Sequence, residues 1–344
     1  MTGSKIYRKI QILLAGFVVL LLAHGVCAAE NDGPTIVKDS IRVTIQNNAG
    51  GDATSQTSAW LPGIDFKVNG PIASGSQLSV EFSLPTRAHW IEADCPTGEI
   101  TADQWWSTSC GGSAIAKAKA VFYSGPMNFT IRMRNELMGT NATLFTGKAQ
   151  VMKVPVYKGS KDFDYYVDED WNIPIGYVYF APDGGHGVTS LNVAFWFRGN
   201  PPTVEAHLFY KGKDIAKYWS AGNDAGDWDP SKNQWGFQEC NFLGVYRTQQ
   251  EAEDGYDPKF GVDKNPGDYE VKVLIVNHLA RSIKFSVGPD GKIVDNGIAT
   301  ANKIGSGRVI VPVQVIGNQG PWNKLAWKTG AFYGNPLTGF TAPQ

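Results

Sequence analysis

The chain has 344 residues, with 31 basic and 32 acidic side chains and a formal net charge of −1 at pH 7. Because the charge is balanced and no long run of like charge occurs, nucleic acid is excluded as the expected partner, and a polybasic membrane patch is absent. The length is typical of about two domains of roughly 150 residues each.

Residues 1–29 are predicted to be a secretory signal peptide. Basic residues precede the apolar stretch 10–22, and the small residues Ala28 and Ala29 offer a cleavage site. The apolar stretch is too short to be a comfortable membrane anchor. A lipid anchor on Cys27 is disfavoured, since Val26 stands where a small residue is usual. No later segment is apolar enough to span a membrane. We therefore expect an exported protein: periplasmic, cell-surface or extracellular.

Beyond residue 30, apolar and polar residues alternate in almost every ordered stretch. Residues 77–82 place Leu78, Val80 and Phe82 on one face, and residues 190–197 follow the same period of two. The stretches 128–133 and 269–276 alternate likewise. A period of two is typical of half-buried strands, and no long stretch of helical period follows the signal peptide. The sequence predicts an all-β protein.

The sequence also matches itself in order along its two halves. Trp60 aligns with Trp171, and QWWSTSC at 104–110 aligns with QWGFQEC at 234–240. The aligned stretches are 58–82 over 169–195, 90–95 over 203–208, 104–110 over 234–240, 125–133 over 266–274, and 152–159 over 309–317. Colinear matches of this kind predict an internal duplication into two self-sufficient modules.

Each repeat holds about seven short strands with turn signals between them, and in this it resembles immunoglobulin-like or fibronectin-like β-sandwiches. The resemblance is at the level of fold. It implies two tandem antiparallel Ig-like β-sandwiches arising from an internal duplication. The expected organisation is module 1 at 36–157, an acidic linker at 158–170, module 2 at 171–317 and an aromatic tail at 318–344. The tail is expected to pack on module 2 or to be exposed to a partner.

Three cysteines remain after cleavage, Cys95, Cys110 and Cys240, and three pairings are open. In an oxidising compartment we favour Cys95–Cys110, because the two end neighbouring strand-like stretches and enclose a short loop. Such a bridge would stabilise the fold by roughly 3 kcal/mol. The alignment puts Leu208 at the position of Cys95, which predicts that Cys240 is a buried free thiol near Leu208.

The stretch DWDPSKN at 227–233 is a candidate calcium site. Its alternate oxygen-bearing residues are Asp227, Asp229, Ser231 and Asn233. Oxygens at alternate positions of a turning loop converge on one point, which suits Ca²⁺. The pattern departs from a calcium-binding EF-hand loop, with Lys232 at the glycine position. The alternative is a polar turn, since these are ordinary turn residues. A second acidic cluster lies in the linker: Asp162, Asp164, Asp168, Glu169 and Asp170.

Tryptophans are the other candidates for binding. Those that recur in both repeats, Trp60 with Trp171 and Trp105 with Trp235, are expected to be core residues. Those without a counterpart are the candidate ligand-binding residues, because exposed rings can stack on sugars: Trp106, Trp219 and Trp228.

No catalytic residues are predicted. The sequence has no HExxH, GxSxG or P-loop motif, and its histidines stand singly. The favoured function is therefore a non-catalytic exported protein that acts as an interaction or structural component, with a protein or glycan partner. The alternative is a carbohydrate-binding protein, with calcium as its one candidate cofactor. A hydrolase comes third, since a site rather than a fold decides activity.

Overall fold

The computed structural model describes residues 33–49, 59–183, 188–199, 201, 203–220, 232–244, 258–304, 307–317 and 320–343. The predicted signal peptide lies outside these residues. The first eight strands are β1 (Thr35–Gln46), β2 (Leu61–Asn69), β3 (Ser76–Leu84), β4 (Arg87–Cys95), β5 (Trp105–Gly111), β6 (Gly125–Asn135), β7 (Thr140–Pro155) and β8 (Phe163–Val167).

The other eight strands are β9 (Ile175–Asp183), β10 (Val188–Arg198), β11 (Val204–Tyr210), β12 (Lys213–Ser220), β13 (Trp235–Phe242), β14 (Gly267–Ile275), β15 (His278–Val287) and β16 (Val309–Val315). The helices are α3 (Ile298–Ala301) and α4 (Trp327–Gly334), and the 3₁₀ turns are η1 (Gly112–Ala114), η2 (Lys117–Lys119), η3 (Asp170–Asn172), η4 (Pro258–Phe260) and η5 (Val262–Lys264). In the part of the chain that the structure describes, none of the helices has the length and apolar character needed to cross a bilayer.

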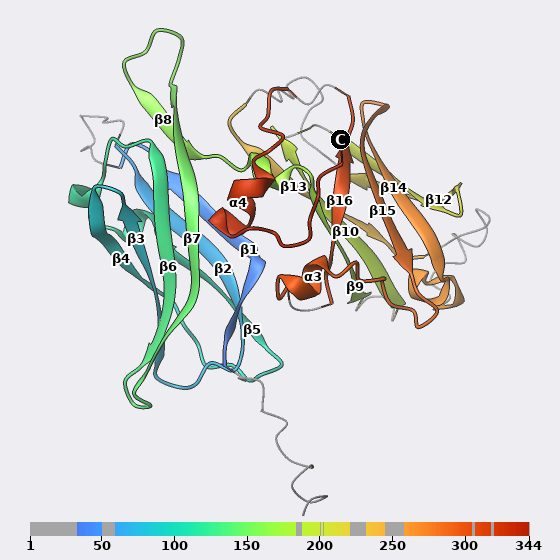
Figure 1. Ribbon diagram of the computed structural model, residues 1–344, viewed down its shortest axis with the longest axis horizontal. Coiled ribbons are helices and arrows are strands. Elements are labelled where there is room, and N and C mark those ends of the chain that lie inside the picture. The colour runs from blue at the N-terminus through green and yellow to red at the C-terminus, as the bar shows by residue number, and fades with distance from the viewer. Residues whose placement is uncertain are drawn as a thin grey trace, which may run out of the picture.

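The strands form antiparallel sheets, so the all-β prediction is confirmed (Figure 1). Strands β1 to β8, here called the first half, form a three-stranded sheet of order β1-β2-β5 and a five-stranded sheet of order β4-β3-β6-β7-β8. Strands β9 to β16, the second half, form one sheet of order β12-β11-β14-β15-β16-β9-β10-β13. This sheet curves until its edge strands β12 and β13 approach each other. Two separate sheets are therefore not found in the second half.

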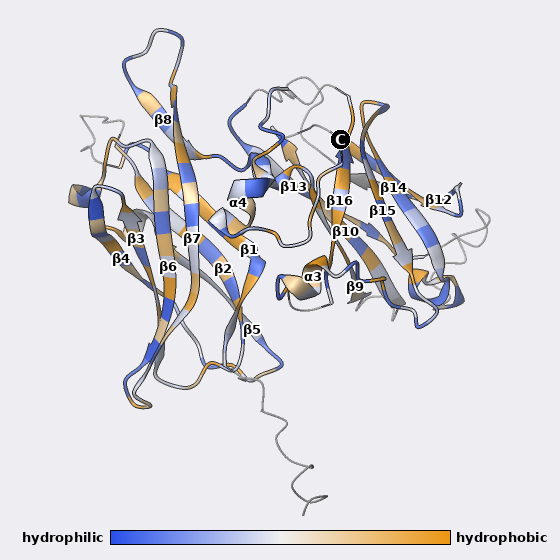
Figure 2. Ribbon diagram, in the orientation of Figure 1, coloured by the Kyte–Doolittle hydropathy of each residue, from blue (hydrophilic) through white to orange (hydrophobic). Residues whose placement is uncertain are grey.

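The predicted alternation produces this architecture. In β3, Leu78, Val80 and Phe82 are buried while the residues between them are partly exposed. The same alternation runs along β14, and Figure 2 shows it as alternating colours along the strands. Because successive side chains of a strand point to opposite faces, each strand gives one apolar face to the core. The buried residues gather in two clusters: one holds the core of the first half together with facing residues of β9, β10, α3 and β16, and the other is the core of the second half.

The strand order of the first half recurs in the second. Each strand of the first half occupies the same place as the strand eight positions later: β1-β2-β5 matches β9-β10-β13, and β4-β3-β6-β7-β8 matches β12-β11-β14-β15-β16. Irregularities recur too. Gly125 opens β6 with φ 142° and pairs with Val151, and Gly267 opens β14 with φ 146° and pairs with Val287. A register shift then follows Ile131 in β6 and Val273 in β14.

The QWxxxxC stretches lie on equivalent strands in the same register. Trp105 pairs with the last residue of β2 and Cys110 with Ile64, while Trp235 pairs with the last residue of β10 and Cys240 with Val193. The first and last parts of the sequence alignment are wrong by one strand: it sets β2 over β9 and the end of β7 over β16, whereas the strand order matches β2 with β10 and β8 with β16. Neighbouring strands share the same alternation, so an amphipathic strand resembles its neighbour as well as its true counterpart.

The corrected match changes the position equivalent to Cys95. Cys95 pairs with Leu78 on β3, and by the same register Ser220 pairs with Val204 on β11. Ser220, rather than Leu208, therefore stands in the place of Cys95.

The predicted linker and tail are both part of the packed structure. Residues 158–170 contain β8, which pairs with the end of β7, and η3 begins at Asp170. The tail, defined here as residues 320–343, lies between the halves (Figure 1): its helix α4 contacts β7 and β1, and Thr338 beyond it is hydrogen-bonded to Asn302. Its buried residues belong to the cluster that contains the core of the first half, and not to the separate core of the second half.

Candidate functional site

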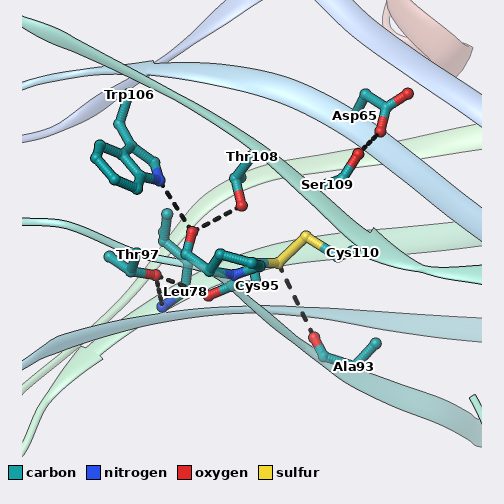
Figure 3. The surroundings of a disulfide bond; sticks show 10 residues. Asp65, Leu78, Ala93, Cys95, Thr97, Trp106, Thr108, Ser109 and Cys110 are labelled. Carbon is teal, nitrogen blue, oxygen red and sulfur yellow. Dashed lines mark hydrogen bonds between the residues drawn. A yellow bond between two sulfur atoms is a disulfide. The ribbon is translucent and has the colours of Figure 1, made fainter. Parts of the chain in front are cut away.

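Trp106, a predicted ligand-binding residue, is half-buried and engaged. Its indole Nε1 donates a hydrogen bond of 2.9 Å to the carbonyl of Pro96 (Figure 3). Its ring lies on the backbone of Gly98, where an added Cβ would stand 2.6 Å from it. Trp106 therefore holds the loop before β5 in place. The backbone of Trp219 belongs to β12 and pairs with Glu205, but its side chain lies outside the description, as does Trp228 altogether.

The recurring tryptophans do not all lie in the core. Trp60 and Trp171 are buried, as expected. Trp105 is 57% exposed, so the expectation of a core residue is wrong there. Its ring faces solvent beneath the Lys67 ammonium, 4.3 Å from the ring centroid. The cause is the alternation of β5, which points Cys110 inward and therefore turns Trp105, an odd number of residues away, outward.

Most of the candidate calcium loop lies outside the described residues: Asp227, Asp229 and Ser231. Asn233 is described, and its Oδ1 accepts a hydrogen bond of 3.3 Å from Arg198. Among the residues that the structure describes, no group of three or more His, Cys, Asp or Glu side chains is arranged to hold a metal ion.

The predicted disulfide is confirmed. Cys95 at the end of β4 and Cys110 in β5 are bonded, with their Cα atoms 4.8 Å apart (Figure 3). The bond ties the edge strands of the two sheets of the first half together. Cys240 is a buried free cysteine, as predicted, and burial raises the pKa of its thiol.

The densest polar constellation lies at the junction between the halves and centres on Asp170. This buried carboxylate accepts hydrogen bonds of 3.2 Å from Arg198 on β10 and 3.0 Å from the indole of Trp235 on β13. It also accepts a bond of 2.7 Å from the backbone N–H of Asn323 in the tail. One side chain of η3 is thus bonded to the second half and to the tail. Because charged hydrogen bonds between buried groups are strong and directional, this contact fixes the three parts together.

A second buried carboxylate, Glu169, precedes Asp170 in the chain. It accepts a hydrogen bond of 2.7 Å from the hydroxyl of Tyr333, which itself accepts one of 3.2 Å from the backbone N–H of Val43. Burial raises the pKa of Glu169, although the hydrogen bond from Tyr333 opposes the effect. Burial also raises the pKa of Tyr333, so the phenol is the hydrogen-bond donor at neutral pH.

The strand β1 makes further contacts of the junction. Asp39 pairs with Arg308, whose guanidinium lies 4.4 Å from the ring centroid of Tyr179. Arg42 stacks on Trp196 with its guanidinium carbon 4.4 Å from the ring centroid. One oxygen of Asp39 has no hydrogen-bond partner within the described protein. The charged groups Asp39, Arg42 and Arg308 thus join elements, because each contacts a residue of another element through an ion pair or a cation–π contact.

Two hollows accompany these groups. A cavity of about 190 Å³ separates the tail from the first half, and Lys148, Gln150 and Asp168 line one side of it. Burial raises the pKa of Asp168. An open groove of about 580 Å³ lies on the second half, where its lining includes Phe209 and Lys284. Its other lining residues are Lys211, Gly212, Asp268, Tyr269, Glu270, Phe285 and Ser286.

Sequence reasoning missed both the junction and the groove. In the sequence, the residues DED at 168–170 stand out only as part of the acidic cluster, which suggests a calcium site. Their partners Arg198, Trp235 and Tyr333 lie far along the chain, and no local pattern links them. The groove is lined mainly by residues of β11, β14 and β15. In the sequence, the outward face of each of these strands looks like an ordinary solvent-exposed face.

Comparison with models of protein families finds no match for the chain, and a search of curated proteins finds none either.

Proposed function

We propose that the protein is a non-catalytic exported component with an interaction or structural role at the cell surface, in the periplasm or outside the cell. It is built from two fibronectin-like β-sandwiches that arose by internal duplication. The layout of residues 1–29 supports export. No catalytic residue or cofactor is needed for this role.

The fold part of the proposal is supported by strand order. Within each half, the first, second and fifth strands lie together, and so do the fourth, third, sixth and seventh. This is the order of fibronectin-like sandwiches, to which each half adds an eighth strand. The duplication is supported by the glycines and register shifts that recur at matched positions, because independent origins would not place irregularities alike.

The observation that carries the functional proposal is the bonding of Asp170, which follows β8 of the first half in the chain, to both the second half and the tail. Tandem modules joined by a mobile linker move independently, whereas bonds across a buried junction hold them in one orientation. A fixed pair of sandwiches is suited to spacing or presenting a surface.

Calorimetry tests this coupling. The wild-type protein is expected to unfold in one transition. Asp170→Ala is expected to separate the melting of the two halves, because it removes the carboxylate that joins β10, β13 and the tail. Asp94→Ala, at an exposed position of β4, is the matched control. Two independent transitions in the wild-type protein would contradict the coupling. Turnover of any member of a panel of glycoside, ester, phosphate and peptide substrates would overturn the non-catalytic role.

The second candidate function is carbohydrate binding, and the open groove favours it. The groove combines the ring of Phe209 with carboxylate, ammonium and hydroxyl groups from β14 and β15. An aromatic face beside groups that donate and accept hydrogen bonds suits a polyhydroxylated ligand. The Lys272 ammonium lies 4.2 Å from the ring centroid of Phe209 and would share that ring with a sugar.

Affinity electrophoresis in gels that contain soluble polysaccharides tests this candidate. The wild-type protein should be retarded, and Phe209→Ala should lower the affinity for the polysaccharide about tenfold. Phe122→Ala, which removes an exposed ring from the first half, should leave it unchanged. Equal retardation of the three proteins, or none, would exclude the groove.

Calcium binding is part of the second candidate function. If Asp227 and Asp229 hold Ca²⁺, its addition should raise the melting temperature, and Asp229→Ala should abolish the rise. An unchanged melting temperature with either calcium or chelator would remove calcium from the proposal.

A further inference from the structure

The first half is not closed by its own strands. In the second half β16 pairs with β9, where Val309 lies opposite Val178. The equivalent strands β8 and β1 form no ladder within the described residues. The amide of Asn47 bridges them: it donates a hydrogen bond of 2.9 Å to the carbonyl of Tyr165 and accepts one of 2.7 Å from its N–H. A side chain therefore replaces the ladder at this side of the sandwich.

The tail fills this open side. Four of its apolar residues are buried in the cluster that contains the core of the first half: Phe332, Tyr333, Leu337 and Phe340. The ring of Tyr333 packs edge-on against Phe129 of β6, with centroids 5.8 Å apart. Trp171 packs on Tyr333 at 5.3 Å and on Phe332 at 6.4 Å. The core of the first half is thus completed by residues from the far end of the chain.

Polar contacts fix the position of the tail. The hydroxyl of Tyr333 lies between Glu169 and the backbone of Val43. The amide of Asn335 donates a hydrogen bond of 2.7 Å to the carbonyl of Thr146 on β7. We call these contacted residues of the first half the tail-binding surface: Val43, Phe129, Thr146, Glu169 and Trp171. It combines aromatic contacts with three specific hydrogen-bonding groups, as a peptide-binding site does.

The backbone of the tail is strained at the residues that fill this surface. Phe332 and Tyr333 have φ values of 45° and 53°, in the left-handed region that bulky residues avoid. Such strained conformations persist where the surrounding contacts impose them, and they concentrate at clamps and switches. Gly317, which follows β16, and Gly320, the first residue of the tail, also have positive φ, which glycine adopts without strain. A partly open pocket of about 190 Å³ lies between α4 and β7.

We propose that the tail-binding surface is a peptide-binding site for the C-terminal segment of this chain, and that a second copy can supply that segment. The inference rests on the proposed interaction role and names its partner. A segment that fits in cis fits equally well from another molecule, and exchange of an identical element is a direct route to association. Within one chain, the tail competes at an effective concentration in the millimolar range. The cis form therefore dominates until the tail is released.

The first test uses full-length protein whose own tail is weakened by Phe332→Ala and Tyr333→Ala together. The probe is a fluorescent synthetic peptide of residues 320–343. The double variant is expected to bind it with a dissociation constant below about 10 μM, while the wild-type protein binds about 100-fold more weakly because its surface is filled. Leu325→Ala, at an exposed tail position, is the matched control and should behave as wild type. A folded double variant that does not bind the peptide would overturn the inference.

If near-ultraviolet circular dichroism shows that the double variant is unfolded, a cleavable chain replaces it. A protease recognition sequence is placed between Gly317 and Gly320 of the wild-type protein, and the folded protein is cut. The labelled peptide should then replace the cut tail, whereas a peptide with Phe332→Ala and Tyr333→Ala should not. Absence of replacement at millimolar peptide would again overturn the inference.

Exchange between copies is tested by mixing two tagged variants. One carries the weakened tail, and the other carries Trp171→Ala, which weakens the tail-binding surface. Each alone is expected to be monomeric, and the mixture should form a one-to-one heterodimer in native mass spectrometry. If Trp171→Ala does not fold, Glu169→Ala takes its place. A mixture that stays monomeric refutes exchange, whereas enzymatic turnover would refute the proposed function and leave these binding results intact.

Discussion

The hydroxyl group of Tyr333 donates a hydrogen bond of 2.7 Å to the buried carboxylate of Glu169, although 164 positions separate the two residues in the sequence. This bond places the end of the chain in the core of the first half. It also satisfies a carboxylate that would otherwise be buried without a partner. The relationship explains why neither residue has a recognisable local signature.

Tyr333→Phe should destabilise the protein by about 1–3 kcal/mol. The substitution keeps the ring but removes the donor to Glu169 and the acceptor for the N–H of Val43, which leaves two buried polar groups unsatisfied. Urea unfolding at neutral pH measures the change. Tyr157→Phe, at an exposed position, should cost nothing measurable. Equal stability of the Tyr333→Phe variant would show that the hydrogen bonds at the tail do not contribute.

The raised pKa of Glu169 should give the junction a pH dependence of known sign. An acid whose folded pKa lies above its unfolded value of about 4.5 binds more protons in the folded state between those two values. Stability contributed by its protonated form is therefore present at low pH and lost as pH rises through the folded pKa. Glu169→Gln, which stays neutral, should lack this loss. The melting temperature of Glu169→Gln minus that of the wild-type protein should increase as the pH is raised from 4. A difference that does not change with pH would contradict the prediction.

Ser220→Cys should create a second disulfide, with Cys240. The prediction follows from the shared register, in which Ser220 occupies the place of Cys95 and Cys240 that of Cys110. Mass spectrometry of the protein after alkylation under denaturing conditions would show no free thiol at Cys240. Leu208→Cys, placed according to the uncorrected sequence alignment, is the control and should leave Cys240 free. A free Cys240 in the Ser220→Cys variant would refute the strand equivalence.

Arg281→Met should raise stability by about 1 kcal/mol. Arg281 is fully buried in the second half, where burial lowers its pKa to about 9. Its guanidinium donates to the carbonyls of Ala280 and Trp196, but its Nε has no partner. An apolar side chain of similar length avoids the desolvation of that charge. Chemical denaturation checks this, and a large loss of stability would show that the two hydrogen bonds outweigh the desolvation of the charge.

The strands, the turns and the disulfide were accessible from local sequence. Alternation such as that of Leu78, Val80 and Phe82 is a property of adjacent residues, and Cys95 and Cys110 are close enough in the chain to meet across one loop. The equivalence of strands between the two halves was harder to predict from the sequence. The alignment slipped by one strand in its first part because β2 resembles both β9 and β10. Trp105 shows a further limit, since its recurrence in both halves suggested burial while its phase within β5 turned it outward.

The sequence alone determined the class of fold, the recurrence of QWxxxxC and the pairing of Cys95 with Cys110, because each depends on periodicity or on short separations along the chain. The tertiary structure decided which strands are equivalent, that the tail belongs to the first half, and that Glu169 and Asp170 join elements instead of standing free in a linker. These outcomes depend on which surfaces remain uncovered after the strands have paired. An uncovered surface is a property of the assembled sheets, so the segment that fills it is decided by shape and burial across the whole chain.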